Sequence, residues 1–283
     1  MKRPKIVPLV AVSVLASLAF AFPADAQSIW VPRGEKNSLL FEALHTSLER
    51  FDEDLSTGVV YLSGRFELGH AVAIVMELPH IQVDATYRNQ YGFDYSLVGD
   101  ADGNPYLGAE LRPYNSDFFF ELGARAPLMP DDQPEAVLLG SYADQSRVAV
   151  FLPETASAQL VFNMRHVTSG GLLTRLRFGP VLEIPTENTD VRDLELHAVF
   201  GWQIGYERKT VRVGGAITGQ SNVTESYPPL GARTTSQFEF HADFGHWPVR
   251  PGVDLRLPIG EDALLVSLVV GGSLGAKIGR AHV

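Results

Sequence analysis

Hydrophobic and polar residues alternate along most of this chain after residue 26. Near residue 240, for example, Phe238 and Phe240 alternate with Gln237 and Glu239. Side chains with a period of two lie on opposite faces of a β-strand. Pro79 predicts a break or a bulge in the third such segment. Twelve segments are predicted to be strands: 38–49, 56–68, 70–87, 104–112, 117–127, 156–166, 171–184, 194–207, 209–220, 234–245, 252–259 and 263–276.

The predicted strands and their connections have the proportions of a membrane barrel. Most segments exceed the about 5–6 residues that are usual in soluble sheets, and they match the about 9–11 residues that cross a bilayer as a tilted strand. The odd-numbered connections are mostly long and acidic, whereas the even-numbered ones are mostly short. Outer-membrane barrels combine long outer loops with short periplasmic turns. The long connections, which include residues 88–103 and 128–155, are therefore predicted to lie on the outer side.

The first 26 residues are predicted to be a cleaved signal peptide. A basic start and the apolar run of residues 6–22 precede the small-residue cleavage motif A-D-A at residues 24–26. Such a signal directs a bacterial protein to the cell envelope or beyond. The alternative is an uncleaved membrane anchor, which usually needs a longer apolar run.

The C-terminal end is predicted to be a non-native tail. The sequence IGRAHV at residues 278–283 is what a common sequencing adapter, ATC GGA AGA GCA CAC GTC, encodes. Residues 277–283 are therefore left out of the fold prediction, with a genuine polar tail as the alternative. The barrel is expected to occupy residues 27–276.

The composition excludes several classes of protein. A formal net charge of −10 argues against a nucleic-acid partner, because nucleic-acid binders carry basic patches. The chain has no cysteine, which excludes disulfides, thiolate zinc sites and iron–sulfur clusters. No cofactor is expected.

Together these patterns make residues 27–276 resemble bacterial outer-membrane β-barrel proteins of the small porin or transporter kind. The resemblance rests on architecture rather than on a motif. It implies an all-β fold, a single antiparallel transmembrane barrel of about 12 strands in the bacterial outer membrane. It also implies contact with outer-membrane lipid and with the barrel-assembly machinery, whereas the oligomeric state is not indicated. One departure is that the last predicted strand lacks the terminal aromatic residue common in such barrels. A soluble β-sandwich with the same periodicity is the alternative fold.

Charged residues share the face opposite the apolar one and are predicted to line the lumen. They could face an open water-filled path for small solutes, or pair with one another and close it, since a twelve-stranded barrel lies between the filled and the open sizes. The function predicted is a channel or transporter for small solutes; the alternative is a structural or adhesive barrel. The predicted lumen-lining residues are Arg65, Glu110, Arg112, Glu121, Arg125, Arg165, Arg175, Arg177, Glu195, Arg212, Glu239, Asp243 and Arg256.

Catalysis and metal binding are not predicted. Some outer-membrane barrels are lipid hydrolases, but the chain has no G-x-S-x-G motif, and no serine and histidine are placed together by the predicted strands. An outer-membrane lipid-modifying enzyme is therefore the third hypothesis. The acidic segment of residues 100–104 offers oxygen ligands for Ca²⁺, but it lacks the distal glutamate of an EF-hand, and a turn before Pro105 is the preferred interpretation.

Overall fold

The computed structural model describes residues 37–50, 53–88, 94–114, 116–144, 147–187, 194–224, 234–244, 249–259 and 266–275. The predicted signal peptide of residues 1–26 and the predicted tail of residues 277–283 lie outside the described residues. Among the described residues, no helix combines the length and the apolar character needed to cross a membrane.

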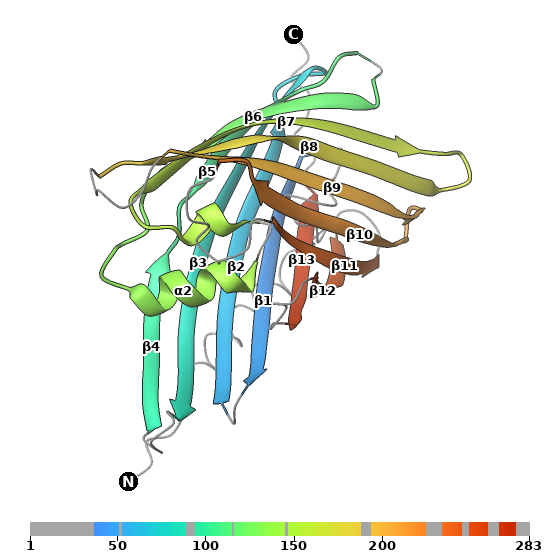
Figure 1. Cartoon of the computed structure of the whole chain (residues 1–283). Coiled ribbons are helices and arrows are strands. Elements are labelled where there is room, and N and C mark those ends of the chain that lie inside the picture. Colours follow the sequence, from blue (N-terminus) through green and yellow to red (C-terminus); the bar gives the residue numbers. More distant parts are fainter. Residues whose placement is uncertain are drawn as a thin grey trace.

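The described chain forms antiparallel strands with one α-helix and one short 3-10 helix. Each strand pairs with the next one along the chain, except that β4 does not pair with β5, which pairs with β3 instead. Because β13 also pairs with β1, the hydrogen-bonded ring closes (Figure 1). The strands are β1 (Ser38–Arg50), β2 (Glu53–Glu67), β3 (Val72–Arg88), β4 (Asp94–Asp102), β5 (Tyr106–Leu111), β6 (Phe118–Arg125), β7 (Thr155–Val167), β8 (Leu172–Pro185), β9 (Glu195–Glu207), β10 (Val211–Asn222), β11 (Thr234–Phe244), β12 (Val249–Ile259) and β13 (Val266–Gly275). The helices are α2 (Pro134–Ala143) and η1 (Val148–Phe151).

The wall has twelve strand positions, as the sequence predicted, because β4 and β5 share one. Both strands pair with β3, β5 along Val72–Glu77 and β4 along His80–Arg88. The prediction that residues 88–103 form a connection without a strand was wrong, since β4 occupies residues 94–102. Pro79 does not break β3; it lies where the neighbouring strand changes from β5 to β4, and its carbonyl accepts a 3.1 Å hydrogen bond from the Gly103 amide.

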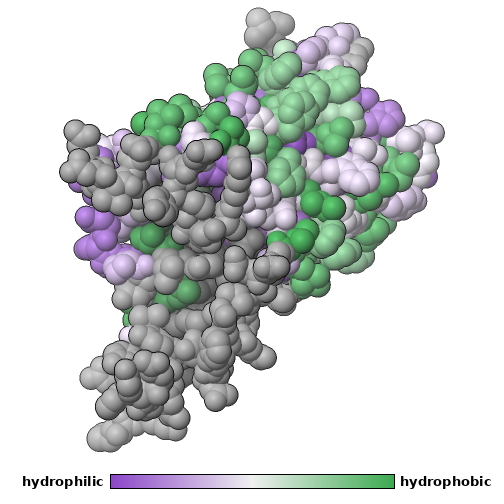
Figure 2. Space-filling model, in the orientation of Figure 1, coloured by the Kyte–Doolittle hydropathy of each residue, from purple (hydrophilic) through white to green (hydrophobic). Residues whose placement is uncertain are grey.

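Apolar side chains cover the outside of the wall, so the membrane barrel is preferred over the sandwich. In Figure 2, hydrophobic residues (green) spread over the upper part of the visible face, and hydrophilic ones (purple) gather at its margins. A soluble sheet would bury these side chains, whereas lipid accepts them. The exposed apolar residues on strands include Leu62, Met76, Leu107, Phe118, Phe120, Leu122, Leu160, Leu172, Phe178, Trp202, Ile204, Phe238, Phe240, Phe244 and Val253.

The polarity of the two faces reverses toward the outer end of β3. Up to Leu78 the outward side chains are apolar, and beyond it they are His80 and Gln82. On the inward face, the apolar Ala73 and Val75 precede the buried Glu77, and the fully buried Ile81 and Val83 follow it. The outer part of β3 therefore has the pattern of a soluble sheet and extends past the lipid-facing belt.

The reversal occurs because a segment of the chain fills that part of the barrel interior. This plug segment, described over residues 126–144 and 147–154, contains α2 and η1, and α2 packs against β1, β2, β3 and β4 (Figure 1). The prediction that residues 128–155 form an outer loop was wrong. The apolar stretches AVLLG at 136–140 and VAVFL at 148–152 need burial, which the lumen provides. The shared core contains Leu44, Val59, Tyr61, Ile81, Val83, Ala101, Met129, Ala136, Leu139, Val150 and Phe151.

Candidate functional site

Arg147 attaches the plug segment to two strands of the barrel wall. Its guanidinium lies 2.8 Å from the Glu77 carboxylate on β3 and 3.1 Å from the Glu42 carboxylate on β1. Within the plug it also pairs with Asp144 at 2.9 Å. The Arg147 group is centred 4.0 Å from the Tyr61 ring, which adds a cation–π contact.

Arg256 extends this cluster to β12, which lies two strands from β1 in the ring. It pairs with Asp144 of the plug at 2.5 Å, with Glu42 of β1 at 3.2 Å and with Asp254 on its own strand at 3.1 Å. Glu42 and Asp144 therefore each contact both arginines. The plug anchor, defined as Glu42, Glu77, Asp144, Arg147 and Arg256, joins three wall strands through one segment.

The plug anchor is shielded from water, which makes its pairing energetically important. The side chains of Arg147, Asp144 and Glu77 are 0 % exposed. Burial alone would lower the pKa of Arg147, but the Glu42, Asp144 and Glu77 carboxylates raise that pKa above its usual range. The guanidinium therefore stays charged, and removal of one partner from such a cluster leaves an uncompensated buried charge.

Asn104 fixes the base of the plug segment at the break between β4 and β5. Its side-chain amide donates to the carbonyls of Ala149 and Leu152 at 3.0 and 2.7 Å. Its side-chain oxygen accepts hydrogen bonds from the backbone amides of Leu128 and Met129, both at 2.8 Å. One fully buried side chain thus holds both ends of the plug segment.

Substitution of Asn104 by alanine should destabilise the protein by about 1–3 kcal/mol, because buried backbone groups would lose their partners. Asn163→Ala is the matched control, since Asn163 is also buried but its hydrogen bonds are long, at 3.3 and 3.4 Å. The measurement is urea unfolding of the protein in lipid vesicles. Equal losses of stability for the two variants would contradict the clamp assigned to Asn104.

The opposite side of the lumen contains a ladder of ion pairs between neighbouring and next-neighbouring strands. Arg177 on β8 pairs with Glu121 on β6 at 3.1 Å. Glu207 on β9 contacts both Arg165 on β7, at 2.6 Å, and Arg212 on β10, at 3.0 Å. The tyrosine hydroxyl of Tyr106 donates to Glu121 at 2.5 Å. This side of the lumen is polar, and α2 packs against the other side, on β1 to β4.

The other predicted lumen residues have varied surroundings. Arg65 pairs with Glu110 at 2.8 Å, Arg125 with Glu77 at 2.6 Å, and Arg212 with Asp243 at 3.5 Å. Arg175 is half-buried on β8, opposite Arg165 in the β7–β8 register. Arg112 makes a cation–π contact with the Phe119 ring, at 4.7 Å from its centroid. Glu239 accepts hydrogen bonds from Thr218 and Gln237 at 2.5 and 2.8 Å. Glu195 forms an ion pair with His197 at 3.3 Å.

These contacts favour the alternative in which the inward charges pair with one another over the one in which they face an open path. Most of the inward arginines and carboxylates are buried, and Arg165 and Arg177 contact glutamates on nearby strands. In the described interior the inward charges are therefore mostly paired, and the plug segment occupies the part next to β1 to β4.

Sequence reasoning missed Glu42, Asp144 and Arg147 as site residues and did not select Glu77. Asp144 and Arg147 lie in a segment that was predicted to be outside. The available signal was the apolar sequence around them, at residues 136–140 and 148–152, which is unusual for a solvated loop.

Comparisons with known proteins agree on the fold. No family model matches the chain, and no curated protein matches its sequence. An outer-membrane channel from Pseudomonas putida F1 has a TM-score of 0.57 at 9 % identity, covering 88 % of this chain and 98 % of that one. The transport unit of the autotransporter AIDA-I from Escherichia coli has a TM-score of 0.52 at 11 % identity, covering 98 % and 100 %.

A third similar structure is LpxR from Salmonella typhimurium, with a TM-score of 0.51 at 9 % identity, covering 84 % of this chain and 100 % of that one. At these identities the similarity concerns the fold alone. The chain has the fold of bacterial outer-membrane β-barrels, as its sequence predicted.

Proposed function

Starting from this outer-membrane barrel fold, we propose that the protein is a gated channel for small polar or charged solutes, with the plug segment as its gate. The observation that carries the proposal is the plug anchor. It holds the segment in the lumen by ion pairs with β1, β3 and β12 rather than by the strand pairing that builds the wall. A segment held in this way can leave without opening the ring of strands.

The lining that would remain after the plug segment moves is suited to polar solutes. Glu42, Glu77 and Arg256 would face the vacated space, and the ladder of Arg165, Arg177 and Arg212 lines the other side. Barrels of about 8 strands are filled by side chains and those of 16–18 leave a channel. Twelve positions with an internal segment removed leave room for a narrow passage. No catalytic role is part of this proposal.

The test locks the gate with a disulfide in a chain that has no cysteine of its own. A β-carbon added at Gly99 of β4 would lie 3.6 Å from the β-carbon of Ala136 in α2, within the about 3.5–4.5 Å of disulfides. The variant Gly99→Cys/Ala136→Cys should show no openings in planar bilayers when oxidised. Addition of reductant should restore the conductance of the wild type.

Each single variant, Gly99→Cys or Ala136→Cys, serves as a control and should conduct as the wild type does under both conditions. An oxidised double variant that still opens would show that the plug segment is not the gate. A wild type without conductance at any voltage would favour the structural or adhesive barrel instead.

A further inference from the structure

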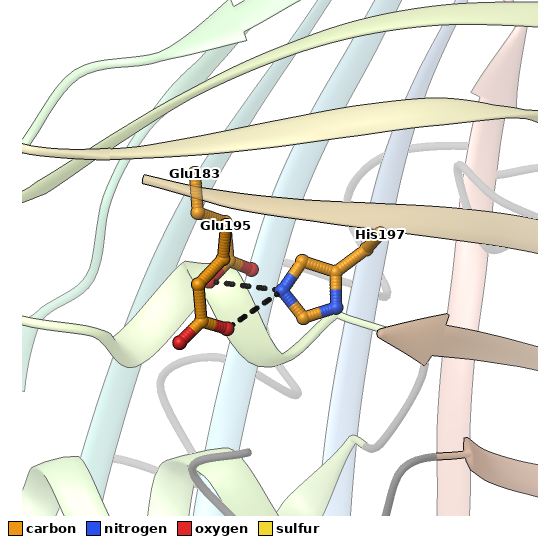
Figure 3. A group of neighbouring side chains, drawn as sticks. All are labelled: Glu183, Glu195 and His197. Carbon is orange, nitrogen blue, oxygen red and sulfur yellow. Dashed lines mark ion pairs between the residues drawn. The ribbon is translucent and has the colours of Figure 1, made fainter. Parts of the chain in front are cut away.

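Three side chains that can ligate a metal converge inside the barrel, apart from the plug anchor. Glu183 lies near the end of β8, and Glu195 and His197 lie at the start of β9 (Figure 3). The β8–β9 register places Glu183 directly opposite Glu195. His197 is two residues further along β9, on the same face as Glu195. All three residues are buried.

The imidazole of His197 is directed at both carboxylates but hydrogen-bonds to neither. Its Nε2 atom lies 3.4 Å from a Glu183 oxygen and 3.3 Å from a Glu195 oxygen. The side chain is 4 % exposed, and Nε2 has no hydrogen-bond partner. One ligand atom from each residue lies within 4.8 Å of the other two. A buried imidazole nitrogen thus faces two carboxylate oxygens at the spacing of ligands around one metal ion.

The two carboxylates of this cluster pair with a histidine, whereas other glutamates in the lumen pair with arginines. Like charges directly opposite each other on paired strands are destabilising. No arginine in the described part of the chain pairs with Glu183 or Glu195, whereas Glu42, Glu77, Glu121 and Glu207 do pair with arginines. Asn222 on β10 donates to Glu195 at 2.9 Å, which is a neutral contact. Among the described residues the two carboxylates share the single His197 imidazole, and a bound divalent cation would neutralise them more fully.

We propose that Glu183, Glu195 and His197 bind a divalent transition-metal cation of the Zn²⁺ type. Zinc bonds to histidine nitrogen and carboxylate oxygen are about 2.0–2.2 Å long, so two ligand atoms of a tetrahedral site lie about 3.4 Å apart. The two nitrogen–oxygen distances, 3.4 and 3.3 Å, match this edge. Ca²⁺ and Mg²⁺ prefer oxygen ligands only, so the imidazole selects against them.

The bound cation would join β8 to β9 by ligands, near their shared connection, and water would supply the fourth ligand of the open tetrahedral position. Asn222 would orient Glu195 from the next strand, as hydrogen bonds to ligating carboxylates do in metal sites. The site is separate from the proposed gate, so it does not depend on the channel function.

The test is titration of the folded wild-type protein in detergent with Zn²⁺ by calorimetry, together with the unfolding temperature. We expect one ion per chain and a rise in the unfolding temperature with Zn²⁺. Glu183→Gln and His197→Gln should each weaken binding at least 10-fold. His241→Gln is the matched control because His241 is also a buried inward histidine, with Gln203 as its 3.0 Å partner, and it should bind as the wild type does.

A wild type that takes up no Zn²⁺, or a His197→Gln variant that binds it as tightly, would overturn the site. A second measurement needs no variant. Co²⁺ bound to the wild type should show the visible absorption bands of tetrahedral coordination, and Zn²⁺ should displace it. Their absence would also overturn the proposal. Neither result bears on the disulfide experiment, so the channel proposal and the metal-site proposal are tested independently of each other.

Discussion

Arg147→Gln is expected to raise the open probability of the channel on the order of 100-fold. The substitution leaves the buried Glu42, Glu77 and Asp144 with fewer cationic partners, and breaking a buried ion pair costs about 3–5 kcal/mol. The substitution destabilises the plugged state relative to the open one, because water would hydrate the carboxylates once the plug segment leaves. A difference of about 3 kcal/mol corresponds to about two powers of ten in an equilibrium.

Single-channel recording in planar bilayers measures this effect, and limited proteolysis within residues 126–154 gives a second readout. Arg208→Gln is the matched control. Arg208 is exposed at the short β9–β10 connection and donates hydrogen bonds to the backbone carbonyls of Ser169 and Gly170 and to the Tyr206 hydroxyl. Equal open probability and equal proteolysis for Arg147→Gln and the wild type would show that the plug anchor does not hold the gate.

Phe240→Arg should prevent or strongly weaken insertion into lipid. Phe240 is 53 % exposed on the outward face of β11, next to Leu255 of β12 in the register. An arginine on the lipid face costs about 2–4 kcal/mol near the bilayer midplane. The measurement is folding into vesicles across a urea series, with the difference in migration between heated and unheated samples reporting the folded fraction.

Gln82→Arg is the control for this prediction. Gln82 also points outward but lies on β3 beyond Leu78, where the outward face is polar, so its cost should be below about 1 kcal/mol. From the sequence alone, His241→Arg would be the natural mild control. The structure makes it unsuitable because His241 is buried close to Arg212 and Arg175. Equal losses for Phe240→Arg and Gln82→Arg would mean that the lipid-facing belt is misplaced.

The sequence predicted the wall well because its signal is local. Lipid requires every outward residue to be apolar, so the period of two runs through whole strands, as in Phe238, Phe240 and Phe244. The signal failed in β4, because that strand lies where the lipid-facing belt ends and Asp100 and Asp102 face outward. Because the outward residues there are acidic, the sequence of β4 resembles that of a loop, and no strand was predicted.

The candidate site was harder to predict because its partners are distant in sequence. The inward position of Arg256 follows from alternation, but its partners Asp144 and Glu42 are 112 and 214 residues away. Alternation does not say that a connection folds back into the lumen. The exact register between Glu183 and Glu195 likewise depends on the length of the β8–β9 connection, and only the structure brings them opposite each other.

The position of the plug anchor also imposes an order on assembly. β13 is the last of the described strands, and it lies between β1 and β12 in the ring. Glu42 belongs to β1 and Arg256 to β12, so the two wall residues that meet at the plug come from either side of the final strand. Their contacts can be completed only when β1 has come together with β12 and β13. The plug therefore cannot be fully secured in a half-built barrel, and its attachment marks the completion of the fold.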